Sequence, residues 1–244
     1  MSASVSLPVA ILAGGLATRL RPLTETVPKV LLEVANRPFL EHQLARLREQ
    51  GVKDVVLCVG YLGETIREQF GDGRDHGIRI SYSFDGPVLL GTGGAIRKAL
   101  PLLGEAFFVM YGDSYLRIDF AEVESAFRRL GKPGLMTLFH NQDHWDVSNV
   151  SYANGAIRRY DKVRRDADMQ HIDYGLSVFK ADVFKAYAAD EVLDLAHVMR
   201  TLVDQGQMAG FEARERFYEI GSHEGLRELN EFLDDGAKQK QGAR

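Results

Sequence analysis

The sequence predicts an α/β fold built on a mainly parallel sheet. Short apolar runs with the length of buried strands occur at 9–12, 55–59 and 107–111, and a glycine follows each of them within two residues. Segments with apolar residues at helical spacing separate these runs. Strands that alternate with helices pair in parallel through right-handed crossovers, with helices on both faces of the sheet.

The other elements of the first half follow in order. A helix is predicted between Pro38 and Gly51, where leucines recur every three or four residues. A second helix is predicted over 62–70, and a half-buried strand over 78–84, where apolar and polar residues alternate. Asp119 has the position of an N-cap, so a further helix is expected to begin there.

From residue 134 onward the pattern changes to short strand-like pieces joined by turns. These pieces lie at 135–139, 149–152, 156–160 and 174–179, and Asn154-Gly155 is a strong hairpin signal. The pattern predicts a smaller α+β region. We therefore expect one domain over 1–235, with a change of architecture at about residue 134, and a flexible tail over 236–244.

Composition and charge exclude several classes of protein. The 244 residues are 45% hydrophobic and 26% charged, which is ordinary for a globular protein, and the single cysteine, Cys58, falls in an apolar run where burial is the expected role. The net charge of −4 argues against general nucleic-acid binding. The sequence has no signal-peptide pattern and no run near the ~18 apolar residues of a membrane span, so we expect a cytoplasmic protein without a membrane partner.

The strongest functional signal lies at 9–29, which reads VAILAGGLATRLRPLTETVPK. A predicted strand runs directly into Gly14 and Gly15, whose lack of side chains lets backbone amides approach a phosphate. Three basic residues and a single acid follow: Arg19, Arg21, Lys29 and Glu25. These donors indicate a site for a polyanion. The glycine pair alone could also be a tight turn that binds nothing.

A second candidate is Asp113, which follows Gly112 and the predicted strand 107–111. Ligands of open α/β sheets gather at the carboxyl ends of the strands, where a carboxylate is well placed to bind a metal ion. An aspartate that only stabilises a turn is the alternative. The residues alone favour neither interpretation.

The segment 9–29 as a whole resembles the signature of the sugar-phosphate nucleotidyltransferases, the family that makes nucleoside-diphosphate sugars. The matching positions are Gly14, Gly15, Thr18, Arg19, Leu20, Pro22, Leu23, Thr24, Pro28 and Lys29. The resemblance extends over nearly the whole chain. It implies a Rossmann-like, mainly parallel mixed sheet flanked by helices, with a nucleotide-binding region over about 1–133 and a smaller α+β region over about 134–235 that binds the sugar phosphate. It also implies Mg²⁺ as the cofactor.

The resemblance also assigns residues to the nucleotide and the metal. It implies nucleotide contacts at Leu12, Ala13, Gly14, Gly15, Asp85, Gly91, Thr92 and Gly93. On their own, residues 91–93 would be interpreted as a loose helix N-terminus. Asp113 is implied to be catalytic and a Mg²⁺ ligand, with Glu219 as the second ligand at a position where the family has aspartate. Arg19 and Lys29 are implied to be catalytic because they neutralise phosphate charge.

For the sugar phosphate, the resemblance implies contacts at Asn149, Lys162, Asp173 and Tyr174, with Lys162 also catalytic. The family's Glu-Lys-Pro motif is replaced by Tyr160-Asp161-Lys162, so the lysine is kept while its neighbours differ. A solvated turn carboxylate is the alternative for Asp173. The histidines and the aspartate at 140–144 are interpreted as an ordinary polar loop, because their pattern would not bring them together on a metal.

The implied reaction joins an NTP to a sugar 1-phosphate and releases pyrophosphate. Guanylyl transfer to a manno-configured sugar or heptose 1-phosphate is the expected specificity, and uridylyl transfer to an amino-sugar 1-phosphate is the first alternative. Thymidylyl or cytidylyl transfer, a cytidylyltransferase for a non-sugar phosphate, and a non-catalytic regulatory homologue that binds a nucleotide sugar are the others. Family members are often dimeric or tetrameric, so a homo-oligomer is compatible with the resemblance.

Overall fold

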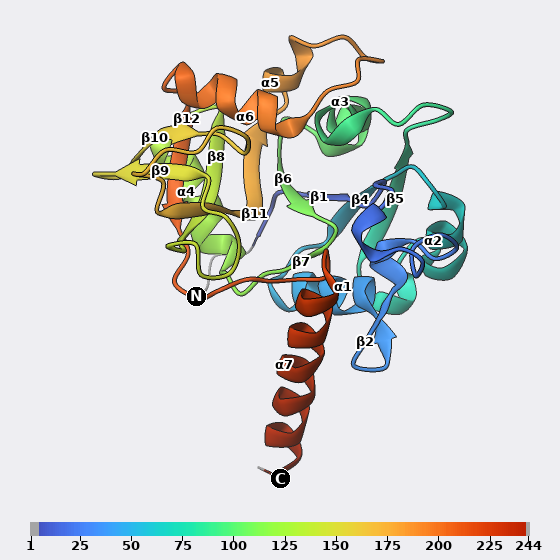
Figure 1. Cartoon of the computed structure of the whole chain (residues 1–244). Helices are drawn as coiled ribbons and strands as arrows, with labels where there is room; N and C mark the ends of the chain where they lie inside the picture. Colours follow the sequence, from blue (N-terminus) through green and yellow to red (C-terminus); the bar gives the residue numbers. More distant parts are fainter. Residues whose placement is uncertain (1–4, 243–244) are drawn as a thin grey trace.

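The computed structural model describes residues 5–242, which form a nine-stranded mixed sheet, two small two-stranded sheets and flanking helices (Figure 1). The strands are β1 (Val9–Leu12), β2 (Glu33–Val34), β3 (Arg37–Pro38), β4 (Asp54–Val59), β5 (Arg79–Phe84), β6 (Ala106–Tyr111), β7 (Ser114–Tyr115), β8 (Gly134–His140), β9 (Val150–Ala153), β10 (Ala156–Tyr160), β11 (His171–Lys180), β12 (Met208–Glu212) and β13 (Tyr218–Glu219). The helices are α1 (Phe39–Glu49), α2 (Gly63–Phe70), α3 (Gly91–Leu103), α4 (Phe120–Leu130), α5 (Asp182–Lys185), α6 (Leu195–Asp204) and α7 (His223–Gly242). The predicted α/β fold class is confirmed.

The sheet has a parallel centre and a mixed extension. Strands β6, β1, β4 and β5 lie side by side in this order and run parallel. Strand β11 pairs antiparallel with β6 and brings β8, β9 and β10 into the same sheet, while β12 pairs parallel with β8. The predicted smaller α+β region therefore continues the central sheet. The carboxyl ends of the parallel strands share one edge, which is where ligands of such sheets bind.

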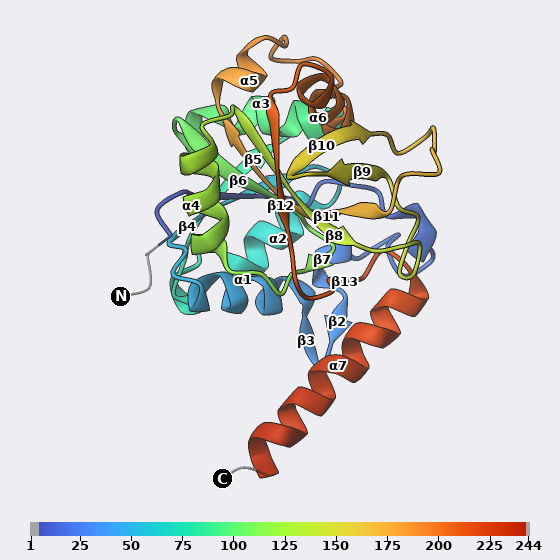
Figure 2. The same ribbon diagram turned by 90° about the vertical axis from the view of Figure 1, so that its left-hand side faces the viewer.

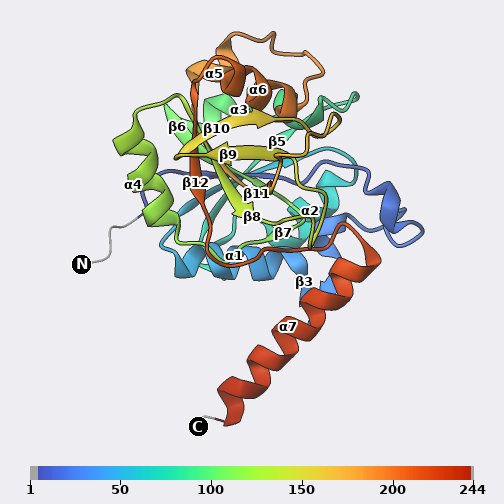
Figure 3. The same cartoon turned by 60° about the vertical axis from the view of Figure 1, so that its left-hand side comes forward.

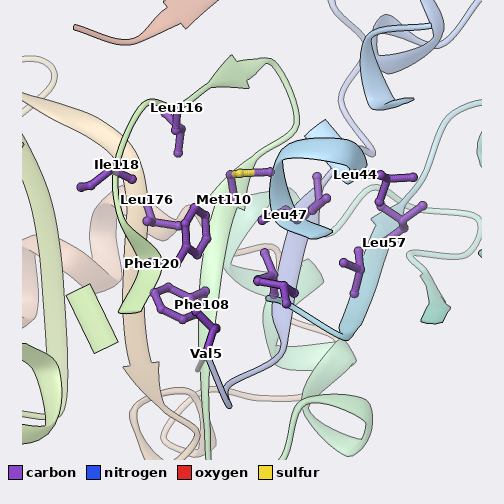
Figure 4. Close-up of a cluster of buried hydrophobic side chains, with 14 of the residues drawn as sticks. Val5, Leu44, Leu47, Leu57, Phe108, Met110, Leu116, Ile118, Phe120 and Leu176 are labelled. Carbon is purple, nitrogen blue, oxygen red and sulfur yellow. The ribbon is translucent and has the colours of Figure 1, made fainter. Parts of the chain in front are cut away.

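Two hydrophobic cores cover the two faces of the sheet. In β1, Val9 and Ile11 belong to one core and Ala10 to the other, as strand alternation requires. Helices α1, α2 and α4 pack on the first face, and α3, α5 and α6 on the second (Figure 2). Figure 4 shows the first core, to which Leu44 and Leu47 of α1 and Met110 of β6 all belong. Burial of each large apolar side chain there contributes about 1.5–3 kcal/mol to the stability of the fold. Together these side chains hold α1 against the sheet.

The local signals of the sequence correspond to elements of the structure. Asp119 caps α4, because its carboxylate accepts hydrogen bonds from the N–H groups of Ala121 and Glu122 at 2.8 and 3.1 Å. Asn154 and Gly155 both have positive φ and connect β9 to β10, as the hairpin signal predicted. Helix α6 and strand β12 were not predicted, and β11 begins earlier than expected, so 171–175 lies in a strand.

Helix α7 extends away from the sheet (Figures 1 and 3). Its first turns are fixed by a small core that contains Leu229, Ile220, Val34 and Phe39. The helix continues to Gly242 and so includes most of the segment 236–244, for which we expect a flexible tail; residues 243–244 lie outside the described residues. Among residues 5–242, no helix combines the length and the apolar character needed to cross a membrane.

Candidate active site

A cavity of about 250 Å³, called here the first cavity, opens at the carboxyl ends of β1, β4 and β6. Seven of the residues expected to contact a nucleotide line it: Leu12, Ala13, Gly14, Gly15, Asp85, Gly91 and Thr92. Lys29 and Asp113 also line its wall. The structure therefore brings together three segments that are separated by tens of residues in the chain.

The glycine loop after β1 passes very close to the neighbouring strand. A Cβ atom at Gly14 would lie 2.8 Å from the backbone nitrogen of Gly60, and a Cβ at Gly112 would collide with the carbonyl oxygen of Leu12. No atom lies within 4 Å of a Cβ built on Gly15, so that side of the loop is open. Glycine is required where backbones meet, and the open side leaves room for a ligand.

The glycine-rich start of α3 forms hydrogen bonds with the segment that precedes α6. The N–H groups of Gly93 and Gly94 donate to the carbonyl oxygen of Leu193 at 2.8 and 3.1 Å. The Thr92 hydroxyl donates to Asp194 at 3.1 Å and accepts from the N–H of Leu195 at 2.8 Å. Gly93, for which we expect a nucleotide contact, therefore lies behind the cavity wall and does not line it.

A second cavity of about 430 Å³ adjoins the first. Every residue expected to contact the sugar phosphate lines it: Asn149, Lys162, Asp173 and Tyr174. Arg19 and Glu219 line this cavity too, whereas Asp113 and Tyr111 line both cavities. The two cavities therefore meet at the turn that follows β6.

Helix α1 and Lys29 hold the turn that carries Asp113. The amide nitrogen of Gln43 donates to the carbonyl oxygens of Tyr111 and Ser114 at 3.3 and 2.9 Å. Gln43 is 2% exposed, so this clasp is protected from water. One carboxylate oxygen of Asp113 lies 2.9 Å from the ammonium nitrogen of Lys29. The charges at the junction are thus arranged before any substrate binds.

Arg19, Asp113 and Glu219 meet at Gly221. A Cβ atom at Gly221 would lie 2.5 Å from Glu219 Oε2, 3.4 Å from Asp113 Oδ2 and 3.5 Å from Arg19 Nη2. Strand β13 pairs Glu219 with Ser114 of β7, so the ladder places Glu219 next to the Asp113 turn. Three residues far apart in sequence therefore converge on one point at the side of the second cavity.

The donor set at this point fits a hard divalent cation. Mg²⁺ prefers oxygen ligands and usually takes only one or two carboxylates from the protein, with water and phosphate oxygens as the rest. Asp113 and Glu219 supply two such carboxylates, and no group of three or more metal-binding side chains exists among residues 5–242. Glu219 already accepts hydrogen bonds from the N–H of Gly221 and the hydroxyl of Ser222, so its orientation is fixed by the start of α7.

Lys162 belongs to a polar network in the wall of the second cavity, in which its own side chain is 41% exposed and that of Asp173 is 3% exposed. Its ammonium nitrogen lies 3.2 Å from the Tyr111 hydroxyl and 3.7 Å from a carboxylate oxygen of Asp173. Burial alone would lower the pKa of Lys162, but Tyr111 and Asp173 together raise it above its ordinary value, so the charge is retained. Asp173 is only 8% exposed within β11, which excludes the solvated turn carboxylate.

Asn149 and Tyr174 line the second cavity and also bind neighbouring backbone groups. The amide oxygen of Asn149 accepts the N–H of Asp173 at 3.0 Å. The hydroxyl of Tyr174 accepts the N–H of Arg117 at 3.1 Å, and only 1% of Tyr174 is exposed. Both residues line the cavity, and the Asn149 amide oxygen and the Tyr174 hydroxyl each already accept one backbone N–H.

Two other interpretations from the sequence are settled by burial and geometry. Cys58 is buried, and burial raises the pKa of its thiol to about 12, so the thiol is not a reactive nucleophile near neutral pH. In the 140–144 loop, Asp143 forms an ion pair with Arg165. This pair occupies the only carboxylate of the loop, and the ordinary polar loop stays a prediction.

Comparison with known proteins agrees with this geometry. Residues 9–236 match the family model described as nucleotidyl transferase. The chain is 31% identical over 219 residues to the N-acetylmuramate alpha-1-phosphate uridylyltransferase of Neisseria meningitidis, over 87% of this chain and 92% of that protein. It is 32% identical over 181 residues to the D-glycero-alpha-D-manno-heptose 1-phosphate guanylyltransferase of Campylobacter jejuni, over 74% of this chain and 79% of that protein.

The fold is also similar to a solved structure. The crystal structure of HddC from Yersinia pseudotuberculosis complexed with GMP-PN has a TM-score of 0.79 and 21% identity, over 93% of this chain and 100% of that chain. The chain belongs to the nucleotidyl transferase family and is an enzyme of that class. Its relatives are sugar-phosphate nucleotidyltransferases, so the family predicted from segment 9–29 is confirmed.

Proposed function

We propose that this enzyme condenses an NTP, preferably GTP, with a manno-configured sugar or heptose 1-phosphate in the presence of Mg²⁺. A phosphate oxygen of the sugar 1-phosphate attacks the α-phosphorus of the NTP, the bond from that phosphorus to the bridging oxygen breaks, and pyrophosphate leaves. The observation that carries this proposal is the junction of two cavities at Asp113. A sugar phosphate is already anionic near neutral pH, so the reaction needs no strong general base.

In this proposal each half of the chain binds one of the two substrates. We assign residues 1–133 to the nucleotide, because every residue that lines the first cavity lies between Leu12 and Asp113. We assign residues 134–235 to the acceptor, because most of the second cavity is lined by residues between Asp146 and Glu219. The single domain thus provides two adjoining half-sites.

The cationic residues lower the cost of bringing two anions together. Lys29, beside Asp113, is placed to bind the α-phosphate, and Lys162 is placed to bind the phosphate of the acceptor. Arg19 is placed to meet charge that develops on the departing pyrophosphate. Mg²⁺ held by Asp113 and Glu219 would supply further positive charge for the approach of one phosphate to another.

Asp85 supports guanine as the preferred base. It is 8% exposed and lines the first cavity, and its Oδ2 accepts the N–H of Leu90 at 3.1 Å. Its Oδ1 accepts no hydrogen bond from any group in residues 5–242. Guanine presents two adjacent N–H donors, which suit a carboxylate, whereas uracil presents one N–H between two carbonyl oxygens that a carboxylate repels.

Asp85→Asn is therefore expected to weaken the preference for GTP. The kcat/KM for GTP should fall about 10- to 100-fold, as expected for lost hydrogen bonds to a charged group, while that for UTP falls much less. Asp119→Asn is the matched control, because Asp119 lies outside the lining of both cavities and asparagine still caps α4. An unchanged ratio of GTP to UTP efficiency in Asp85→Asn would contradict the role of Asp85.

A uridylyltransferase for an amino-sugar 1-phosphate is the second candidate. The Neisseria relative is named as a uridylyltransferase and aligns over 92% of its length. A non-catalytic regulatory homologue is disfavoured by the convergence of Arg19, Asp113 and Glu219 at Gly221. A cytidylyltransferase for a non-sugar phosphate would differ in its product, so analysis of the product distinguishes it.

The test is pyrophosphate release across a panel of substrates. GTP, UTP, CTP, ATP and dTTP are each combined with mannose, manno-heptose, glucose and N-acetylmuramic acid 1-phosphates, with and without Mg²⁺. We expect Mg²⁺-dependent release with GTP and a manno-configured acceptor. Release with UTP and an amino-sugar phosphate would support the second candidate. If no combination releases pyrophosphate but the protein binds a nucleotide sugar, the regulatory homologue would be favoured.

A further inference from the structure

Tyr111 connects the two cavities. It is the last residue of β6 and lines both the first and the second cavity. Its hydroxyl accepts a hydrogen bond from Lys162 Nζ at 3.2 Å and donates one to Asp173 Oδ2 at 3.3 Å. The ammonium nitrogen of Lys162 also lies 4.9 Å from the centre of the Tyr111 ring. One side chain of the nucleotide-binding region thus contacts two charged residues of the acceptor cavity, Lys162 and Asp173.

We propose that Tyr111 is a positioning residue that holds Lys162 in the second cavity for the phosphate of the acceptor. This inference rests on the function proposed above. Neither the motif in segment 9–29 nor the residues implied by the family resemblance include Tyr111. Through its position in the wall of both cavities, Tyr111 also links the placement of Lys162 to the turn that carries Asp113.

The argument starts from the flexibility of lysine. A lysine side chain has four rotatable bonds, so its ammonium group needs partners to stay in one place. Asp173 alone lies 3.7 Å from Lys162 Nζ, which is beyond hydrogen-bond distance, so the Tyr111 hydroxyl is the nearer partner. Without that hydroxyl, Lys162 is expected to move toward Asp173, where a closer ion pair would neutralise the charge needed for phosphate.

The chemistry of the tyrosine suits this role. A tyrosine hydroxyl has one hydrogen to donate and lone pairs that accept, so this one group can donate to Asp173 while it accepts from Lys162. Stacking of the ammonium group over the aromatic ring adds a cation–π attraction that favours the same position.

The experiment compares Tyr111→Phe with Tyr160→Phe. The Tyr160 hydroxyl donates to the same oxygen of Asp173 at the same distance, 3.3 Å, but makes no hydrogen bond to Lys162 and its residue lines neither cavity. Tyr111→Phe should raise KM for the sugar 1-phosphate about tenfold, as expected for a lost hydrogen bond to a charged group, and leave KM for the NTP within about twofold. Tyr160→Phe should change acceptor KM far less.

A double-mutant cycle with Lys162→Met tests whether Tyr111 acts through the lysine. In the Lys162→Met background, Tyr111→Phe should have no further effect on acceptor KM. The same comparisons are made for binding of mannose 1-phosphate by calorimetry, which does not depend on turnover. Equal effects of Tyr111→Phe and Tyr160→Phe, or an undiminished effect in the Lys162→Met background, would overturn the inference.

The two readouts also separate this inference from the proposed function. Wild-type enzyme that binds mannose 1-phosphate but transfers no nucleotide would count against the reaction, while weaker binding by Tyr111→Phe would still support the inference. Wild-type turnover with equal acceptor affinity in wild type and Tyr111→Phe would support the reaction and overturn the inference. Failure of wild type to bind mannose 1-phosphate would overturn the Tyr111 inference for that acceptor.

Discussion

Asp113→Asn is expected to reduce nucleotidyl transfer on the order of 1000-fold while the protein stays folded. Asp113 lines both cavities, and its carboxylate lies 2.9 Å from Lys29. Asparagine keeps the size of the side chain and leaves the Gln43 clasp on the turn intact, because that clasp uses the carbonyl oxygens of Tyr111 and Ser114. The substitution therefore removes one charge from the junction with little change in packing.

Asp182→Asn is a suitable control for Asp113→Asn. Asp182 also pairs with a lysine, Lys185, at 2.6 Å, but both side chains are exposed and lie outside the two cavities. Exposed pairs of this kind contribute little, so Asp182→Asn should keep wild-type rate and thermal stability. Rates are measured as pyrophosphate release over a range of Mg²⁺ concentrations. A folded Asp113→Asn enzyme within about threefold of the wild-type rate would exclude Asp113 from the catalytic site.

The local features of this architecture could be predicted from the sequence. The strand that ends at Leu12, the helix capped by Asp119 and the Asn154-Gly155 hairpin each depend on neighbouring residues, and local signals were sufficient for them. The segment 9–29 also revealed the family, because glycines and cations that serve one phosphate site lie within one short segment.

The features that sequence could not provide depend on long-range packing. Gly93 was expected in the nucleotide site because it matches a glycine-rich turn of the family, yet its N–H donates to the carbonyl oxygen of Leu193, a residue one hundred positions later. Tyr111 was predicted only as the apolar last residue of a strand. Its hydrogen bonds with Asp173 of β11 and with Lys162 depend on how the strands pair in the structure. A pattern in sequence records which residues are near along the chain, whereas these roles depend on which strands are paired.

Gln43 illustrates the same limit. Periodicity alone does not show whether Gln43 of α1 lies on the polar or the buried face, and no motif marks it. The structure buries it to 2% exposure because its amide nitrogen satisfies two carbonyl oxygens of the Asp113 turn. A buried amide is retained where it satisfies backbone groups that would otherwise lack partners.

Arg19→Ala is expected to lower the rate about 100- to 1000-fold, which corresponds to roughly 3–4 kcal/mol of lost transition-state stabilisation. Arg19 lies in a short 3₁₀ turn, Thr18–Leu20, whose Leu20 is fully buried and anchors the loop. Its guanidinium points to Gly221, where Asp113 and Glu219 also meet. Charge on the leaving pyrophosphate grows in the transition state, so this cation should affect kcat more than the KM of either substrate.

Arg21→Ala is the matched control for Arg19→Ala. Arg21 lies two residues further along the same loop, is exposed and lines neither cavity, so its loss should change the rate by less than about threefold. The two variants remove the same side chain from the same loop, and only position relative to Asp113 and Glu219 differs. Equal losses in both variants would mean that the loop attracts nucleotide by its general charge. A loss confined to Arg19 and expressed in kcat would mean that one guanidinium acts on the reacting phosphates.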